Sequence, residues 1–200
     1  MPEIAIPTPN IAAPSHPTCP IPLRSILREA TAAEHARLDA QLGALDLGQI
    51  AGYRRFLEIN AAALLPLEQS LLHAGVHDVL PDWDDRARTA AVLADLAHLG
   101  GTPRLLDAPA LANRAAILGT LYVLEGSRLG AAYLLRQVRQ CRDPAISGNT
   151  AFLGHGTGRS LWPGFLAILE SHAGDVMNEA DIVTPARRAF ALFEQAATLS

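Results

Sequence analysis

The sequence predicts an all-α domain, and two observations carry that prediction. From Leu23 onward, apolar residues recur at spacings of three and four almost to the end of the chain, which is the period of amphipathic helices. Alternating runs of β-branched residues, which are typical of strands, are scarce. With 200 residues, of which 50% are hydrophobic and 18% charged, the chain is long enough for one domain with a full core. We therefore expect a single-domain bundle of about six helices.

The expected helices follow one another with short loops. The first begins near Leu23 and presents an apolar stripe to the core, made of Leu27, Thr31, His35, Leu38 and Leu42. The second covers about 51–74 and contains Pro66, whose missing N–H is expected to kink this helix or to start a new segment. The remaining elements are helices at about 84–99, 110–140, 161–172 and 185–199, and a Gly-rich loop over 146–160.

Residues 1–22 differ from the rest of the chain, because they hold seven of its fourteen prolines. They lack the basic start and the continuous apolar block of a secretory signal, so we expect a flexible N-terminal arm before a domain at 23–200. No apolar run reaches the roughly 18 to 20 residues of a membrane span. Cys19 and Cys141 make no disulfide framework, which favours the cytoplasm. A net charge of −4 argues against nucleic acid as a partner.

His35 is the first candidate functional residue. It lies on the apolar stripe of the first expected helix, and Asp39 follows one turn later on the same face. A carboxylate at that position can accept a hydrogen bond from one ring nitrogen and thereby orient the imidazole as a metal ligand. The alternative is an ordinary core or rim histidine that is hydrogen-bonded to a carbonyl group.

The second candidate is a stretch of small residues in the helix expected at 110–140. Gly126 and Gly130 lie one turn apart, and Ser127 and Ala131 lie on an adjacent face. Glycine inside a helix costs about 1 kcal/mol relative to alanine, so two of them call for a reason. Close packing of another helix is one explanation. The other is a planar ligand against the helix backbone, with Ser127 holding a water through its hydroxyl.

Other familiar sites are absent from the sequence. The remaining histidines are scattered, and no Glu-x-x-His pair of the kind found in ferritin-like di-iron sites occurs. The Gly-rich segment 154–158 follows no strand and lacks the lysine of a phosphate-binding loop.

Two segments resemble the heme oxygenase family. They are LREATAAEH (27–35), with an acid four residues further on, and YVLEGSRLG (122–130). The resemblance extends over roughly 23–199 and includes the aromatic run AFALFEQ (189–195). It is greatest to the bacterial, biliverdin-forming branch that serves bacteriophytochromes.

The resemblance implies a role for each matched residue. His35 would be the proximal ligand to the iron of heme b, with Asp39 bonded to its other ring nitrogen. Gly126, Ser127 and Gly130 would line the distal face, and Ser127 stands where animal members carry an acid that orders a distal water. The other residues implied to contact heme are Arg28 and Thr31 near the propionates, Ala131, Arg128 and Phe190.

The sequence departs from the family at one place. The usual basic pair of the penultimate helix is missing, because the apolar stretch 165–170 fills that position. Arg128 or Arg159 is expected to take over its contacts with the propionates. Since the orientation of heme decides which meso carbon is attacked, the biliverdin isomer stays open.

The implied activity is oxidative opening of heme to biliverdin, with release of iron and CO. It uses O₂ and an external electron donor such as reduced ferredoxin, and a bacteriophytochrome is the implied acceptor of biliverdin. A carrier or sensor of the same fold, which binds heme without turnover, is the main alternative. A relative that binds no heme, of the thiaminase-like or pyrroloquinoline-forming kind, is less consistent with the LREAT segment and His35.

Overall fold

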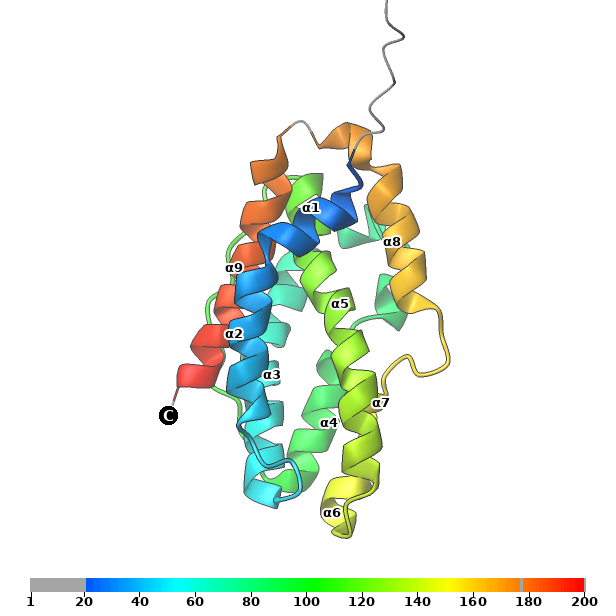
Figure 1. Cartoon of the computed structure of the whole chain (residues 1–200). Helices are drawn as coiled ribbons and strands as arrows, with labels where there is room; N and C mark the ends of the chain where they lie inside the picture. Colours follow the sequence, from blue (N-terminus) through cyan, green and yellow to red (C-terminus); the bar gives the residue numbers. More distant parts are fainter. Residues whose placement is uncertain (1–20, 177, 200) are drawn as a thin grey trace, which may run out of the picture.

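The computed structural model describes residues 21–176 and 178–199, and these form an all-α domain without strands (Figure 1). The expected fold class is confirmed. The prediction of an N-terminal arm at 1–22 concerns residues that, up to position 20, lie outside the described part of the chain. The helices are α1 (Leu23–Ala30), α2 (Ala32–Gly43), α3 (Ile50–His73), α4 (Thr89–Leu99), α5 (Arg114–Arg139), α6 (Pro144–Ser147), α7 (Ala151–Gly154), α8 (Leu161–Ser171) and α9 (Glu179–Thr198), with 3-10 turns at Val76–Asp78, Trp83–Asp85 and Ala173–Asp175.

The core is built around α5 and α9, which pack on each other along much of their length. Gly119 permits this approach, because a Cβ there would clash with the backbone oxygen of Ile182. Helix α9 also packs against α1, α2 and α3, and α3 packs against α4. The buried side chains are mostly leucine, alanine and phenylalanine from these helices. None of the described helices is long and apolar enough to cross a bilayer.

The first expected helix is divided in two at Thr31. Its backbone angles, φ −111° and ψ 9°, leave the helical range and separate α1 from α2. Figure 1 shows α1 running across the upper end of α2. The side chain of Thr31 is buried and donates a hydrogen bond of 2.7 Å to the Leu27 oxygen, which competes with regular helix geometry.

Pro66 does not start a new segment, since α3 is one helix from Ile50 to His73. The N–H that proline lacks would have bonded to the carbonyl of Ala62. In the structure that carbonyl accepts a hydrogen bond of 3.1 Å from the backbone N–H of Leu106, in the loop before α5. The loop thus supplies the missing donor, which a local sequence pattern does not reveal.

Three helix starts differ from the expected positions, and each is explained by a cap. Helix α4 begins at Thr89, where the carboxylate of Glu68 accepts from the backbone N–H groups of Arg88 and Thr89. Helix α5 begins after Asn113, and α9 begins at Glu179, six residues before Pro185, with Asn178 as its cap. The expected loop 146–160 holds the end of α6 and all of α7.

Candidate functional site

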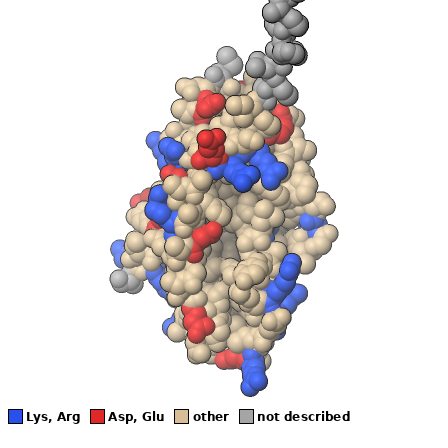
Figure 2. Space-filling model, in the orientation of Figure 1, with Lys and Arg blue, Asp and Glu red and all other residues tan. Residues whose placement is uncertain are grey.

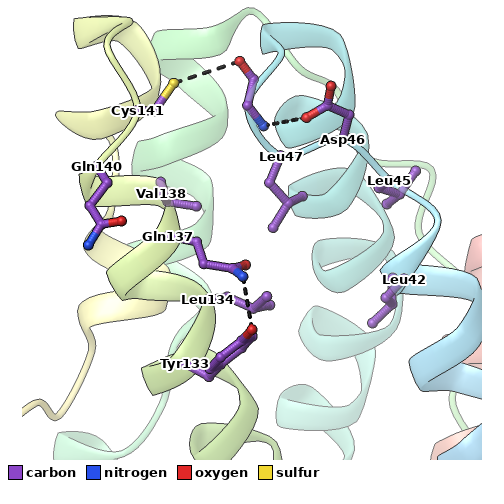
Figure 3. A pocket seen from close by; sticks show the side chains of 12 residues that line it. Leu42, Leu45, Asp46, Leu47, Tyr133, Leu134, Gln137, Val138, Gln140 and Cys141 are labelled. Atoms are coloured by element: carbon purple, nitrogen blue, oxygen red, sulfur yellow. Dashed lines mark hydrogen bonds between the residues drawn. The ribbon is translucent and has the colours of Figure 1, made fainter.

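A slot lies between α2 and α5. Both helices pack against α9, and a cavity of about 510 Å³ separates the end of α2 and the following loop from the second half of α5. Figure 3 shows its apolar lining, with Leu42, Leu45 and Leu47 facing Tyr133 and Leu134. This cavity is one end of the face on which both candidate sites lie.

The glycines of α5 belong to the same face as this cavity. Gly126, Gly130, Tyr133 and Gln137 follow one another at spacings of three or four, so they form one stripe along the helix. A Cβ at Gly130 would meet no atom within 4 Å, and one at Gly126 would meet the ring of Trp162 at an ordinary 3.6 Å. Close helix packing is therefore not the reason for Gly130. The part of the stripe at Gly126 and Gly130 is therefore a wall without side-chain bulk.

His35 lies on the face of α2 that continues into the lining of this cavity. It precedes Leu42, which lines the cavity, by two turns on the same face of α2. Its side chain is 64% exposed, so it is not a core histidine. Its Nδ1 lies 3.1 Å from Oδ2 of Asp39, and its ring meets that of Phe190 edge-on with 5.9 Å between centroids. Among the described residues, Nε2 has no hydrogen-bond partner, and it is free to bind a ligand.

Ser127 is held from behind by a buried arginine. Its hydroxyl donates to the Leu124 oxygen at 2.8 Å and accepts from Nη2 of Arg88 at 3.0 Å. Ser127 itself remains exposed. Sequence reasoning missed Arg88, because it lies 39 positions before Ser127 in the segment that leads into α4.

Basic side chains lie above the slot. Figure 2 shows that the middle of this face is hollowed, with Arg side chains (blue) above it and some Asp or Glu side chains (red) beside them and along its edge. Arg24 and Arg28 are exposed on α1, and both lower the pKa of Tyr122 on α5, although burial raises it overall. The ring centroid of Tyr122 lies 5.7 Å from that of Trp162. Arg24 and Trp162 were not predicted; no short motif marks either.

The carboxylate of Glu170 holds α1 in place at this end of the slot. Its two oxygens accept from the backbone N–H groups of Leu23 and Arg24, at 3.1 and 3.0 Å. Glu170 thereby supplies the N-terminal cap that Pro22 does not give. It belongs to the stretch 165–170 that replaces the family's basic pair, so this stretch contributes to the slot by fixing α1.

Three residues that the sequence predicted to contact heme make hydrogen bonds or ion pairs with other parts of the protein. Arg128 pairs with the buried Glu125 at 2.8 Å and donates to the Arg86 oxygen, on the side of α5 away from the glycines. Arg159 pairs with Asp85 at 2.9 Å. The hydroxyl of Thr31 donates to the backbone oxygen of Leu27 in α1. The structure therefore does not bring Arg128 or Arg159 to the slot, because each has a carboxylate or carbonyl partner closer to hand.

The polar side chains at the slot do not form a metal site of the usual kind. Within residues 21–176 and 178–199, no group of three or more His, Cys, Asp or Glu side chains is placed to hold an ion. A metal at His35 would therefore need to arrive with its other ligands. A planar macrocycle brings them.

Fold and site together define an all-α protein whose slot offers a free imidazole on one wall and bare backbone on the other. The sequence matches the heme oxygenase family over residues 22–198, and the chain belongs to that family. It is 30% identical, over 142 residues, to a heme oxygenase of Xanthomonas campestris pv. campestris (strain 8004), which covers 70% of this chain and 86% of the relative. The predicted family is confirmed, whereas the phytochrome-associated branch stays a prediction.

A solved structure shares the fold. The heme oxygenase of Neisseria meningitidis, known in NO- and CO-bound forms, aligns with a TM-score of 0.71 and 23% sequence identity. The alignment covers 88% of this chain and 90% of that chain. The bundle described above is therefore the heme oxygenase fold over nearly its whole length.

Proposed function

We propose that this chain is a heme oxygenase in activity, opening heme to biliverdin with release of iron and CO in the slot between α2 and α5. The family and the fold support this activity. The observation that carries the proposal for this chain's own residues is the exposed His35, whose Nε2 is free while Nδ1 is fixed by Asp39.

The residues of the slot fit heme. His35 would hold the iron through Nε2, and Asp39 would set the ring's orientation and basicity. The bare face at Gly126 and Gly130 leaves room for a flat ring, and the apolar cavity near Leu42 and Tyr133 suits the ring edge without carboxylates. Bound heme supplies both the iron that activates O₂ and the carbon skeleton that is oxidised.

The heme propionates would lie toward α1. All sixteen basic residues of the chain are arginines, so fixed positive charge near the slot comes from guanidinium groups. Arg28, with Arg24 beside it, stands at the open end near Tyr122, and guanidinium groups bind carboxylates through paired hydrogen bonds. We propose these two in place of the missing basic pair.

The protein contributes to the reaction by positioning the His35 ring and by keeping large side chains away from the O₂ side of heme. Phe190 packs against the His35 ring and limits its rotation. Gly130 and the half-buried Ala131 keep the opposite side open for O₂, and Ser127 offers a hydrogen-bonding oxygen there. These roles follow the resemblance residue by residue.

The external partners are proposed on chemistry alone. Opening the ring consumes electrons, so a one-electron donor such as reduced ferredoxin is proposed. A cytoplasmic location, compatible with the unpaired Cys141, and delivery of biliverdin to a bacteriophytochrome are proposed with it.

The test is a turnover assay on the purified chain. Hemin is added in equimolar amount, ascorbate or a ferredoxin system is supplied in air, and the product is identified by chromatography. The proposal expects a Soret band that decays as biliverdin forms, and the chromatogram names the isomer. A stable Soret band would indicate a carrier or sensor instead. No Soret band would indicate a relative that shares the fold alone.

A further inference from the structure

Helix α1 carries the two arginines that are proposed to face the heme propionates. It has eight residues and lies between α8 and α9 at the upper end of the slot (Figure 1). Its inner face is formed by Leu23 and Leu27, which are buried, and Arg24 and Arg28 each follow by one position on the exposed side. The direction in which Arg24 and Arg28 point therefore depends on how α1 is rotated about its axis.

A carboxylate from α8 holds the first turn of α1. The two oxygens of Glu170 accept from the backbone N–H groups of Leu23 and Arg24, at 3.1 and 3.0 Å. The preceding residue, Pro22, gives no side-chain cap, so Glu170 satisfies two N–H groups that the helix leaves open. A negative charge at this end is also favoured by the helix dipole. Because each oxygen takes a different N–H group, the two bonds fix the rotation of this turn.

A guanidinium from α9 holds the other end of α1. Nε and Nη2 of Arg187 both donate to the backbone oxygen of Ala30, the last residue of α1, at 3.0 and 2.8 Å. A positive charge is favoured at a helix C-terminus. Nε of Arg187 also lies 3.6 Å from Oε1 of Glu34, the residue before His35. Arg187 therefore connects the end of α1 with the start of the helix that carries His35.

These hydrogen bonds supply what apolar packing of α1 does not. Isolated helices shorter than about 12–15 residues are marginal in water, so α1 depends on its neighbours for its position. Burial of Leu23 and Leu27 favours contact with the core, but the hydrophobic effect has no direction. The bonds of Glu170 and Arg187 are directional, and they select one rotation among those that apolar packing allows.

We infer that Glu170 and Arg187 are positioning residues that set the rotation of heme about its own normal, because they fix α1 and with it Arg24 and Arg28. The inference rests on the proposed function and on the proposed contact of the two arginines with the propionates. A flat ring turned within an apolar slot keeps its apolar contacts, whereas its carboxylates must follow the guanidinium groups that bind them. Since that rotation decides which meso carbon is attacked, Glu170 and Arg187 determine the biliverdin isomer without touching heme.

The test compares variants by two measurements. Proton NMR of the ferric heme complex gives the heme methyl shifts, which depend on the rotation of heme, and chromatography gives the share of each biliverdin isomer. Glu170→Ala should add a second set of methyl signals and raise the minor isomer up to about fivefold, the factor that corresponds to about 1 kcal/mol for a lost cap. Arg187→Ala should have the same effect. Glu170→Gln and Arg187→Lys, which keep one acceptor or donor, should restore most of the original pattern.

Two controls remove contacts of the same kind away from α1. Glu58→Ala removes a carboxylate that accepts from the backbone N–H of Thr102 at 3.2 Å. Arg55→Ala removes a guanidinium that donates to the backbone oxygen of Ala196 in α9 at 3.2 Å. Both controls should leave the methyl shifts and the isomer shares unchanged.

Unchanged methyl shifts and isomer shares in either folded alanine variant would overturn the positioning role of that residue. The same changes in the two controls would overturn the inference as a whole. If an alanine variant does not fold, Glu170→Gln or Arg187→Lys takes its place, with a smaller expected change. A complex that binds heme without turnover is tested by NMR alone. A missing Soret band in the unaltered chain would overturn the proposed function, and the inference with it.

Discussion

Asp39 holds the imidazole of His35 from one side, with Oδ2 3.1 Å from Nδ1. Both side chains are largely exposed, so the pair contributes little to the stability of the fold. Its consequence is the orientation of the imidazole: Nδ1 is held by the carboxylate, and Nε2 has no partner among the described residues. The first prediction depends on this relationship.

Asp39→Asn is expected to weaken heme binding by about 10-fold or more, because loss of the carboxylate behind a ligating histidine has that effect on metal affinity. Soret titration measures it. The matched control is Asp84→Asn, since Asp84 pairs with the exposed His77 at 3.0 Å outside the slot. Equal affinities of the two variants would contradict the role of Asp39.

Gly130→Leu separates function from stability. The position is open, so the side chain meets nothing in the protein alone, and helix propensity alone would stabilise the fold by about 0.5–1 kcal/mol. Turnover of heme should nevertheless fall more than tenfold, because the side chain fills the space opposite His35.

Gly119→Ala, on the same helix, is expected to have the opposite effect, because it lowers the stability of the fold. Its Cβ would press on the Ile182 oxygen, so this variant should lower the melting temperature.

Normal turnover of heme in Gly130→Leu would refute the proposal that a ligand lies against the Gly126 and Gly130 face of α5.

The arginine cluster behind α5 predicts a large loss of stability in Glu125→Ala. Glu125 is fully buried and pairs with Arg86 and Arg128, so its removal leaves Arg128 without a carboxylate partner and Arg86 with Asp82 alone. The free energy of unfolding in urea should fall by about 3–5 kcal/mol. Asp85→Ala removes the exposed pair with Arg159 and should cost less than about 1 kcal/mol. Similar losses in the two variants would argue against the buried network.

His155 predicts a pH dependence of stability. Burial, and then the charges of Arg128, Arg88 and Arg159, lower the pKa of His155 below its usual 6.5. In the window between the lowered pKa and 6.5, the unfolded chain binds more protons than the folded one, so stability falls as the pH decreases through it. His155→Gln should reduce the loss between pH 7.5 and 5.5, measured by urea unfolding. The control is His73→Gln, at an exposed position, which should leave the loss of stability between pH 7.5 and 5.5 unchanged.

Local patterns predicted what depends on local spacing. The helical period gave the fold class, and the i, i+4 spacing of His35 and Asp39 correctly indicated that the two side chains meet. Hydrogen bonds between residues that lie far apart in the sequence were not predicted. Arg88 on Ser127 and the Leu106 N–H on the Ala62 carbonyl depend on how helices pack, and no sequence window contains both members. The prediction that Arg128 contacts heme missed its ion pair with Glu125 for a related reason. That pair could be expected only once Glu125 was known to be buried.

The central claim is that His35 binds the iron of heme, and parallel hemin titrations of the unaltered chain, His35→Ala and His77→Ala test it most directly. The account predicts a stoichiometric Soret band with the same ferric spectrum for the unaltered chain and His77→Ala. It predicts loss of that spectrum in His35→Ala, and its partial recovery when imidazole is added. An unchanged ferric spectrum in His35→Ala would contradict the account.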